Sequence, residues 1–291
     1  MEIHDQYRER VNSRLESYLS SIPSSSNFSS ELKNIMKYSV LAGGKRFRPI
    51  LTYTVAGLFN SEFEKVDSSA CAIELIHIYS LIHDDLPAMD DDDIRHNQPA
   101  CHKYFDEAQA ILAGDGLQAL AFEVLVNDSL LDSQIKIELL SMLTHAAFEM
   151  AEGQAIDLSI VDQTVEIKLL ESMHRKKTGA LLSCAVDLGA IVAQSGEQDR
   201  TLLKTFSQAI GLAYQIQDDV LDIEVPVGVL GKQQHSDSEK NKPTYPSIIG
   251  LQGSKEAYQA LYLQAKDCLC DLSVDAQVLQ KLIEKLEARV F

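Results

Sequence analysis

Apolar residues recur at helical spacing along almost the whole chain, and no other feature of the sequence limits the fold as strongly. The opening segment shows the pattern in a stripe of apolar residues four positions apart: Ile3, Tyr7, Val11, Leu15 and Leu19. Alternating runs that form β-strands are scarce, and the one candidate, at 225–229, contains Pro226 and Gly228. The sequence therefore predicts an all-α protein.

The same spacing predicts further helices. We expect them at about 31–42, 47–60, 67–86, 106–127, 133–152, 165–173, 176–195, 199–223, 254–271 and 275–288. Between Pro226 and Pro246 the chain is rich in proline, glycine and polar residues, and a connection of this length inside a compact protein is usually functional or disordered. No linker between domains is apparent, so we expect a single domain over 1–291 with a flap at 226–246.

Charge and cysteine content exclude several classes of protein. The 291 residues include 26 Lys and Arg against 43 Asp and Glu, a net charge of −17, which argues against a general nucleic-acid binder. Five cysteines without a C-x-x-C pair suit a reducing compartment better than a disulfide framework or a zinc site. No apolar stretch approaches the roughly 20 residues that cross a bilayer, and the charged start is unlike a signal peptide. We therefore expect a cytoplasmic protein with no integral membrane segment and no nucleic-acid partner.

An acidic cluster follows one of the most apolar predicted helices. Six carboxylates lie within the ten residues from Asp84 to Asp93, and the preceding helix over 71–83 is apolar on most sides. Such a helix is buried, so it delivers the adjacent Asp84 and Asp85 to the end of a buried element, where Pro87 ends the helix. A solvated acidic loop is the alternative interpretation.

A second pair of adjacent aspartates, Asp218 and Asp219, lies near the end of another apolar helix. One polar stripe runs along that helix: Gly211, Gln215, Asp218 and Asp222. Two such helices facing each other would build one cavity with carboxylates on both walls. Because Mg²⁺ binds a few carboxylates and takes its other ligands from water and substrate phosphates, the pattern predicts a site for magnesium and a diphosphate.

Basic residues stand out in this acidic chain. The segment Gly43-Gly44-Lys45-Arg46-Phe47-Arg48-Pro49 combines glycines that permit close backbone approach with cations that bind phosphate. His77 lies about two helical turns before Asp84, on the same face. Surface charge and a hydrogen-bonded core histidine are the alternative interpretations. We expect one diphosphate to be held through Mg²⁺ and another directly by lysine and arginine.

Motifs in order along the chain resemble those of the bacterial short-chain trans-polyprenyl diphosphate synthases, and most closely those of the farnesyl diphosphate synthases. The matching segments are G-G-K-R-F-R-P (43–49), I-H-D-D-L-P-A-M-D-D-D-D (82–93), K-T-G (177–179), G-L-A-Y-Q-I-Q-D-D-V-L-D (211–222), G-K (231–232) and K-P-T-Y-P (242–246). Together they cover nearly the whole chain.

The resemblance implies a fold and a reaction. The fold would be the terpenoid-synthase helical bundle around a central cavity, and the enzyme would be a homodimer. An allylic diphosphate, first dimethylallyl and then geranyl diphosphate, would ionise, and isopentenyl diphosphate would attack the carbocation to give a product five carbons longer. Three other functions stay open: a geranylgeranyl diphosphate synthase, a terpene cyclase, which has no use for the Lys45 and Arg48 patch, and a non-catalytic subunit of a heteromeric synthase.

Residue roles follow from the same resemblance. Asp84, Asp85 and Asp90 would hold two Mg²⁺ and Asp218 a third, with Asp219 and Asp222 in support and with Mn²⁺ as a possible substitute. The allylic substrate would contact Arg95, Lys177, Thr178, Gln215, Lys232 and Lys242. Isopentenyl diphosphate would contact Lys45, Arg48, His77 and His96. Lys177 and Thr178 would also stabilise the carbocation.

Product length is expected to depend on Tyr79 and Ser80, the fifth and fourth residues before Asp84. In the family, an aromatic residue near this position goes with a fifteen-carbon product and smaller residues with a twenty-carbon product. The sequence departs from the family pattern at His96, where a second arginine is usual. It departs again in the flap at 226–246 and at the C-terminus, where Arg289 stands in for a basic tail.

Overall fold

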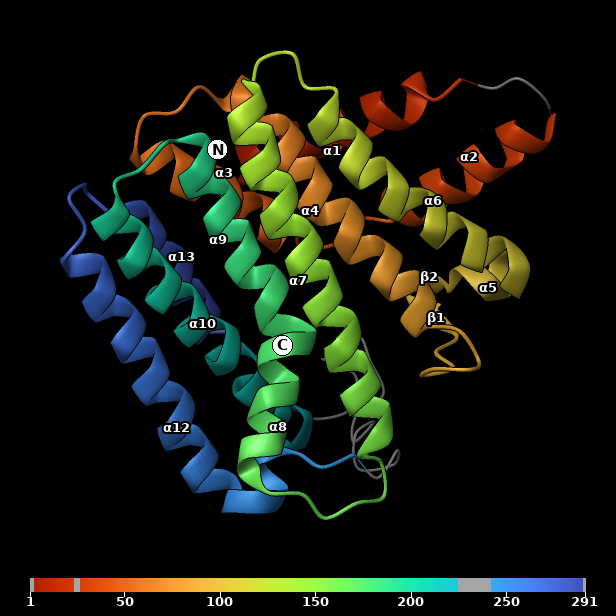
Figure 1. Ribbon diagram of the computed structural model, residues 1–291. Helices are drawn as coiled ribbons and strands as arrows, with labels where there is room; N and C mark the ends of the chain where they lie inside the picture. The colour runs from red at the N-terminus through yellow and green to blue at the C-terminus, as the bar shows by residue number, and fades with distance from the viewer. Residues whose placement is uncertain (1–2, 24–26, 225–241, 290–291) are drawn as a thin grey trace. The chain divides into compact units, whose positions relative to one another are not determined.

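The computed structural model describes residues 3–23, 27–224 and 242–289, and helices make up most of this part of the chain (Figure 1). The chain divides into two compact units: Met1–Ser141 with Ile191–Ala193, and Met142–Ala190 with Gln194–Phe291. The predicted all-α class is confirmed, whereas the single domain over 1–291 stays a prediction. Most of the flap expected at 226–246, including Lys232, lies outside the described residues.

Unit 1 is built around a central helix, α4. Its elements are α1 (Ile3–Ser21), α2 (Asn27–Val40), α3 (Phe47–Leu58), α4 (Phe63–Asp84), β1 (Ile94–Arg95), β2 (Gln98–Pro99), α5 (Cys101–Tyr104), α6 (Glu107–Val126) and the start of α7 (Ser133–Ser159). α4 packs against α3 and α6, and its residues are buried on nearly every side from Val66 to Ile82. The apolar stripe of α1 is buried as expected. Asp84, the last residue of α4, therefore lies at the end of a buried helix.

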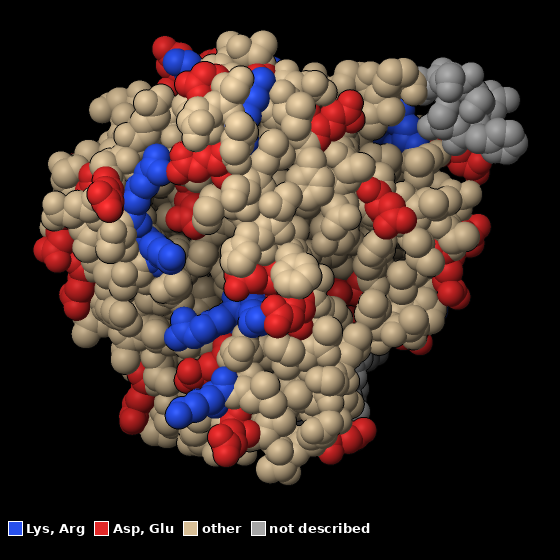
Figure 2. Space-filling model, viewed as in Figure 1, with Lys and Arg blue, Asp and Glu red and all other residues tan. Residues whose placement is uncertain are grey.

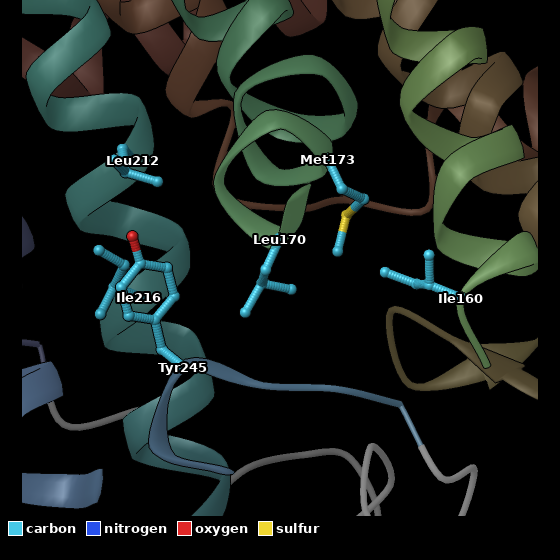
Figure 3. Packing of buried hydrophobic residues seen from close by; sticks show 6 residues of the cluster. All are labelled: Ile160, Leu170, Met173, Leu212, Ile216 and Tyr245. Carbon is cyan, nitrogen blue, oxygen red and sulfur yellow. The ribbon is translucent and has the colours of Figure 1, made fainter. Parts of the chain in front are cut away.

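Unit 2 contains the rest of α7 and the C-terminal helices. Its further elements are α8 (Ile167–His174), η1 (Arg175–Gly179), α9 (Ala180–Val192), α10 (Glu197–Glu224), α12 (Tyr245–Cys270) and α13 (Gln277–Glu287). α10 packs along α12. Figure 3 shows a cluster of buried apolar side chains from the turn just after α7, from α8, from α10 and from the start of α12: Ile160, Leu170, Met173, Leu212, Ile216 and Tyr245.

Several features differ from the expected helices. α7 continues to Ser159, past the expected end near 152, and the four-residue α5 was not expected. α12 begins at Tyr245 rather than near 254, because Thr244 caps it through a reciprocal bond with Ser247. The early start is followed by a break at Gly250, whose φ of 77° is in the left-handed region. A five-residue π-helix, η1, joins α8 to α9. β1 and β2 form a two-residue hairpin that is too short to give an alternating pattern.

One described helix, α6, is long and apolar enough to span a membrane by length and composition alone. The core helices of soluble proteins pass the same test, so α6 is weak support for a membrane segment.

Candidate active site

The first acidic cluster begins at the C-terminus of α4. Asp84 is the last residue of the helix, and Asp85 is its C-cap. The loop then folds back, because the amide of Asp90 donates to the carbonyl of Asp84 at 2.9 Å. This backbone bond keeps Asp84 and Asp90 next to each other in space, and both residues are half-buried. Carboxylates at the negative end of a helix dipole attract a cation, so the local fold favours ion binding here.

Asp85 and Arg95 form a tight pair within unit 1. Asp85 is 1% exposed, and Nε of Arg95 donates to both of its carboxylate oxygens at 3.0 and 3.2 Å. Burial raises the pKa of Asp85, and Arg95 partly offsets this effect. Arg95 is oriented by the β1–β2 hairpin, whose two turn residues, His96 and Asn97, have φ of 50° and 62°. One predicted metal ligand and one predicted phosphate-binding residue thus contact each other directly.

Four of the predicted phosphate-binding residues lie within electrostatic reach of one another in unit 1. Desolvation lowers the pKa of His77 well below its usual value, and the charges of Arg48, His96 and Arg95 add to this effect. The His96 ring packs on Gly44, where an added Cβ would lie 3.2 Å from the ring. We call Arg48, His77, Arg95 and His96 the unit 1 basic group; its permanent charges are those of Arg48 and Arg95. A neutral His77 can donate a hydrogen bond to a phosphate oxygen without adding charge.

The G-G-K-R-F-R-P motif divides between two roles. Arg46 is 3% exposed, forms an ion pair with Glu74 at 2.9 Å and also donates to Asn12 and to the carbonyl of Val40. It therefore fastens the start of α3 to α1 and α4. Lys45 is exposed and Arg48 is half-buried, which leaves these two as the predicted ligand-binding residues of the motif.

In unit 2, Lys177 and Thr178 lie in the π-helix η1, and π-helical turns often mark functional sites. Two glycines bring the neighbouring helices close to this turn. An added Cβ at Gly153 of α7 would lie 2.6 Å from Cα of Lys177, and one at Gly211 of α10 would lie 3.1 Å from Cα of Gly179. Thr178 Oγ1 donates to Oε1 of Gln215 at 2.9 Å, so the structure brings these two predicted substrate-binding residues together.

Asp157, in the last turn of α7, is a site residue that the sequence interpretation missed. Its Oδ2 accepts a bond from Nζ of Lys177 at 2.7 Å and another from Nζ of Lys242 at 2.9 Å. Burial alone would raise the pKa of Asp157, but the two lysines lower it below its usual value. One signal was available, since Asp157 lies on the same helical stripe as the buried Met150 and Gly153.

The aspartates of the second acidic cluster have different surroundings. Asp219 is 3% exposed, lies 3.2 Å from Nε2 of His174 and accepts from the backbone amide of Tyr245 at 3.0 Å. It therefore ties α10 to α8 and to the start of α12. Asp218 and Asp222 are half-buried on the next face of α10. The Arg289 guanidinium stacks 3.7 Å from the Tyr214 ring and approaches Asp218 to 3.6 Å.

Tyr79 is held in place one to two turns before Asp84. It is 8% exposed, its ring lies edge-on to that of His83 with centroids 5.7 Å apart, and it bonds to Gln118 of α6. Ser80 instead donates to the carbonyl of His77 at 2.7 Å. Of the two predicted chain-length residues, Tyr79 therefore has the fixed and bulky side chain.

The donor chemistry of Asp84, Asp90, Asp218 and Asp222 fits Mg²⁺, which prefers carboxylate oxygen. In the described parts of the chain, no three His, Cys, Asp or Glu side chains form a ready-made metal cluster. Asp84 and Asp218 belong to different units. The shared cavity, the metal ligands and the substrate contacts therefore stay predictions.

Comparison with known proteins agrees with these features. The polyprenyl synthetase family model matches residues 29–284. The chain belongs to the polyprenyl synthetase family. It is 43% identical over 277 residues to the farnesyl diphosphate synthase of Haemophilus influenzae, covering 94% of this chain and 93% of that protein. The resemblance drawn from the motifs is thus confirmed at the level of the family, and this prenyl-transfer family is an enzymatic one.

Solved structures give the same family. The geranyltransferase of Legionella pneumophila has a TM-score of 0.88 and 36% identity over 99% of this chain and 96% of its own. A geranyltransferase of Helicobacter pylori, solved in complex with magnesium and isoprenyl diphosphate, has a TM-score of 0.82 and 30% identity over 98% of this chain and 97% of its own. The predicted isoprenoid-synthase fold is therefore confirmed.

Proposed function

We propose that this protein is a farnesyl diphosphate synthase, which condenses isopentenyl diphosphate first with dimethylallyl and then with geranyl diphosphate. The observation that carries the proposal is the presence of two separate sets of cations. Lys177 and Lys242 meet on Asp157 in unit 2, and in the unit 1 basic group the charges of Arg48 and Arg95 act on His77. A reaction in which one diphosphate leaves and another stays needs two such sites. Relatives over nearly the full length carry the same function in their names.

The chemistry assigns a task to each set. Lys177 and Lys242 bind the allylic diphosphate and stabilise the negative charge that grows as its C–O bond breaks, the electron pair leaving with the diphosphate. Within the unit 1 basic group, Arg48, His77 and His96 hold isopentenyl diphosphate by its unreacted end together with Lys45, and Arg95 contacts the allylic diphosphate. The π-electrons of its double bond form the new C–C bond, and transfer of a proton from the adjacent carbon to the released diphosphate restores a double bond. Thr178, positioned by Gln215, lies beside the carbocation.

We further propose that Asp84, Asp85, Asp90 and Asp218 bind three Mg²⁺ together with the allylic diphosphate, and that Mn²⁺ can replace them. Bound metal supplies charge stabilisation for the leaving diphosphate. The support from this chain is that Asp84 and Asp90 lie together at a helix C-terminus and Asp218 is half-buried on α10. Asp85 would exchange its contact with Arg95 for the ion.

We also propose a homodimer that uses α6. Five of the eight exposed residues of α6 are apolar: Ala108, Ile111, Leu112, Ala119 and Val126, beside the acidic Glu107, Asp115 and Glu123. Ile111 and Leu112 are 43% and 52% exposed, although such side chains are usually buried. Figure 2 shows uncharged surface interrupted by acidic side chains in the region of α6. A second copy of the chain would cover this face.

A cytoplasmic location completes the proposal. All five cysteines are free, as expected in a reducing compartment.

A direct assay tests the function. Purified protein is incubated with Mg²⁺, geranyl diphosphate and labelled isopentenyl diphosphate, and the products are identified by mass, with and without EDTA. We expect farnesyl diphosphate with the metal and no product with EDTA. A twenty-carbon main product would instead identify a geranylgeranyl diphosphate synthase. No product from folded protein in the presence of metal would identify a non-catalytic subunit.

A further inference from the structure

We propose that Asp157 is a positioning residue that sets the place and spacing of the two ammonium groups binding the allylic diphosphate. The inference rests on the proposed function, because the diphosphate is the ligand that the two lysines serve. Asp157 itself need not contact the substrate. Its role is to hold Lys177 and Lys242 in one arrangement before the substrate arrives.

The geometry gives Asp157 control over two segments that are far apart in sequence. Lys177 lies 20 residues after Asp157 in η1, and Lys242 lies 85 residues after it, just before α12. Both ammonium groups bond to the same oxygen, Oδ2, so they are held close together. Two positive charges at this separation repel each other, and the shared carboxylate offsets the repulsion.

Burial distinguishes the carboxylate from the lysines it holds. The Asp157 side chain is 5% exposed, whereas those of Lys177 and Lys242 are 25% and 13% exposed. The anion is thus fixed inside unit 2, and the lysines extend from it toward solvent. An ammonium group has three donors, and the bond to Asp157 uses one of those of Lys177.

The α7 helix also fixes the backbone of one of these lysines. Gly153, one turn before Asp157 on the same face, lets the backbone of Lys177 approach α7 closely. α7 therefore contacts Lys177 at two points: its backbone packs where Gly153 leaves room, and its Nζ bonds to Asp157. Preorganised charge of this kind stabilises a leaving group without reorganisation during the reaction.

The Asp157→Asn variant distinguishes a role in positioning the two lysines from a role in setting the net charge of the site. The amide keeps the size of the side chain but removes its charge. If Asp157 acts only by lowering the net positive charge, its neutralisation should tighten diphosphate binding. If it positions the lysines, binding should weaken although the site becomes more positive. We expect the KM for geranyl diphosphate to rise about tenfold to a hundredfold, with the KM for isopentenyl diphosphate changed much less.

The same variant is titrated calorimetrically with inorganic diphosphate and Mg²⁺, and we expect weaker binding than in the wild type. Asp157→Glu, which keeps the charge, should recover part of the affinity. Glu171→Gln is the matched control: Glu171 accepts from the Tyr245 hydroxyl at 2.7 Å, so it links helices of unit 2 without contacting either lysine. It should lower the melting temperature without a selective effect on geranyl diphosphate.

Unchanged or tighter diphosphate binding by Asp157→Asn, or an equal rise in both KM values, would overturn the inference. If Asp157→Asn does not fold, the same measurements on Asp157→Glu decide, since displaced lysines should again weaken geranyl diphosphate selectively and a normal KM would contradict the proposal. Failure of the proposed function is a different result, because the wild type would then form no prenyl product.

Discussion

Single residues of this protein owe their chemistry to what lies beside them. Lys45, Arg46 and Arg48 are near neighbours in one motif, yet Arg46 is buried against Glu74 and only the other two remain as predicted ligand-binding residues. Asp218 and Asp219 divide in the same way, because Asp219 is committed to His174 and to the start of α12. Substitutions at this scale should therefore have separate effects on stability and on substrate binding.

His96 should make isopentenyl diphosphate binding depend on pH. Desolvation and the charges of Arg95 and Arg46 lower the pKa of His96 below its usual value of about 6.5. It is therefore largely neutral at pH 7 and gains a positive charge as the pH falls. A bound diphosphate favours the charged form of His96, so binding takes up a proton. The KM for isopentenyl diphosphate should therefore decrease as the pH is lowered below about 6.5.

His96→Gln serves as the control for this pH dependence, since the substrate and other groups also titrate. The ratio of the KM values of variant and wild type should be near one at pH 8 and grow as the pH falls. His96→Arg, which restores the second arginine usual in the family, should bind tightly at every pH. A constant ratio between variant and wild type from pH 5.5 to 8 would show that His96 does not contribute.

Tyr79 should limit the length of the product. Its ring is fixed by His83 and Gln118, so Tyr79→Ala removes a rigid group and we expect a twenty-carbon diphosphate beside or in place of the fifteen-carbon one. Tyr79→Phe keeps the ring and should keep the fifteen-carbon product. Chromatography and mass spectrometry of the products give the answer, at a temperature where circular dichroism shows both variants folded. A fifteen-carbon product alone from Tyr79→Ala would mean that another residue sets the length.

Whole elements of unit 2 meet through contacts that leave no room for a side chain. The backbone of η1 lies where a Cβ on Gly153 would be, and Gly211 permits a similar approach from the other side. The π-helix therefore depends on glycines in α7 and α10, the helices beside it, as well as on its own sequence.

Gly153→Ala should destabilise the protein although alanine is the better helix former. The added methyl group meets backbone atoms of Lys176 and Lys177, which cannot move aside as a flexible side chain would, and we expect a loss of about 1–3 kcal/mol in the free energy of unfolding. Gly253→Ala is the matched control, because its Cβ would be 3.6 Å from the nearest atoms of Ile249. It should be neutral or stabilise by up to about 1 kcal/mol, as urea denaturation can measure. Equal effects at both glycines would contradict the steric argument.

At the scale of the whole molecule, the exposed apolar side chains of α6 are one feature that the fold of the described residues leaves unexplained. A surface of this kind usually marks an interface, and a second copy of the chain is the partner that the family resemblance implies. In the proposed dimer, the assembly would depend on this face and not on the residues assigned to catalysis.

Leu112→Glu should convert the proposed dimer into a monomer, because it places a charge in the centre of that face. Leu263→Glu introduces the same change on α12, where the leucine is 61% exposed, and should leave the assembly intact. Light scattering after gel filtration gives both masses. A wild-type monomer, or a dimer that persists in Leu112→Glu, would rule out α6 as the interface.

Much of this protein was determined by its sequence alone. The helices, the burial of the helix that ends at Asp84, and the motifs of the family could all be predicted, because helical periodicity and helix-ending residues act over a few neighbouring positions. Among the features that were missed, the early start of α12, the short hairpin and the π-helix depend on a cap, a turn or a close packing contact rather than on a repeated pattern. The last turns of α7 and the four-residue α5 were missed as well.

The tertiary structure alone decided which charged residues are partners. No local pattern links Asp157 to Lys177 and Lys242, or Arg46 to Glu74, since these pairs are separated by 20 to 85 residues. A charged side chain can be assigned to substrate or to structure only when its neighbours are known. Those neighbours are set by how the helices pack, because packing brings distant parts of the chain within the reach of a hydrogen bond.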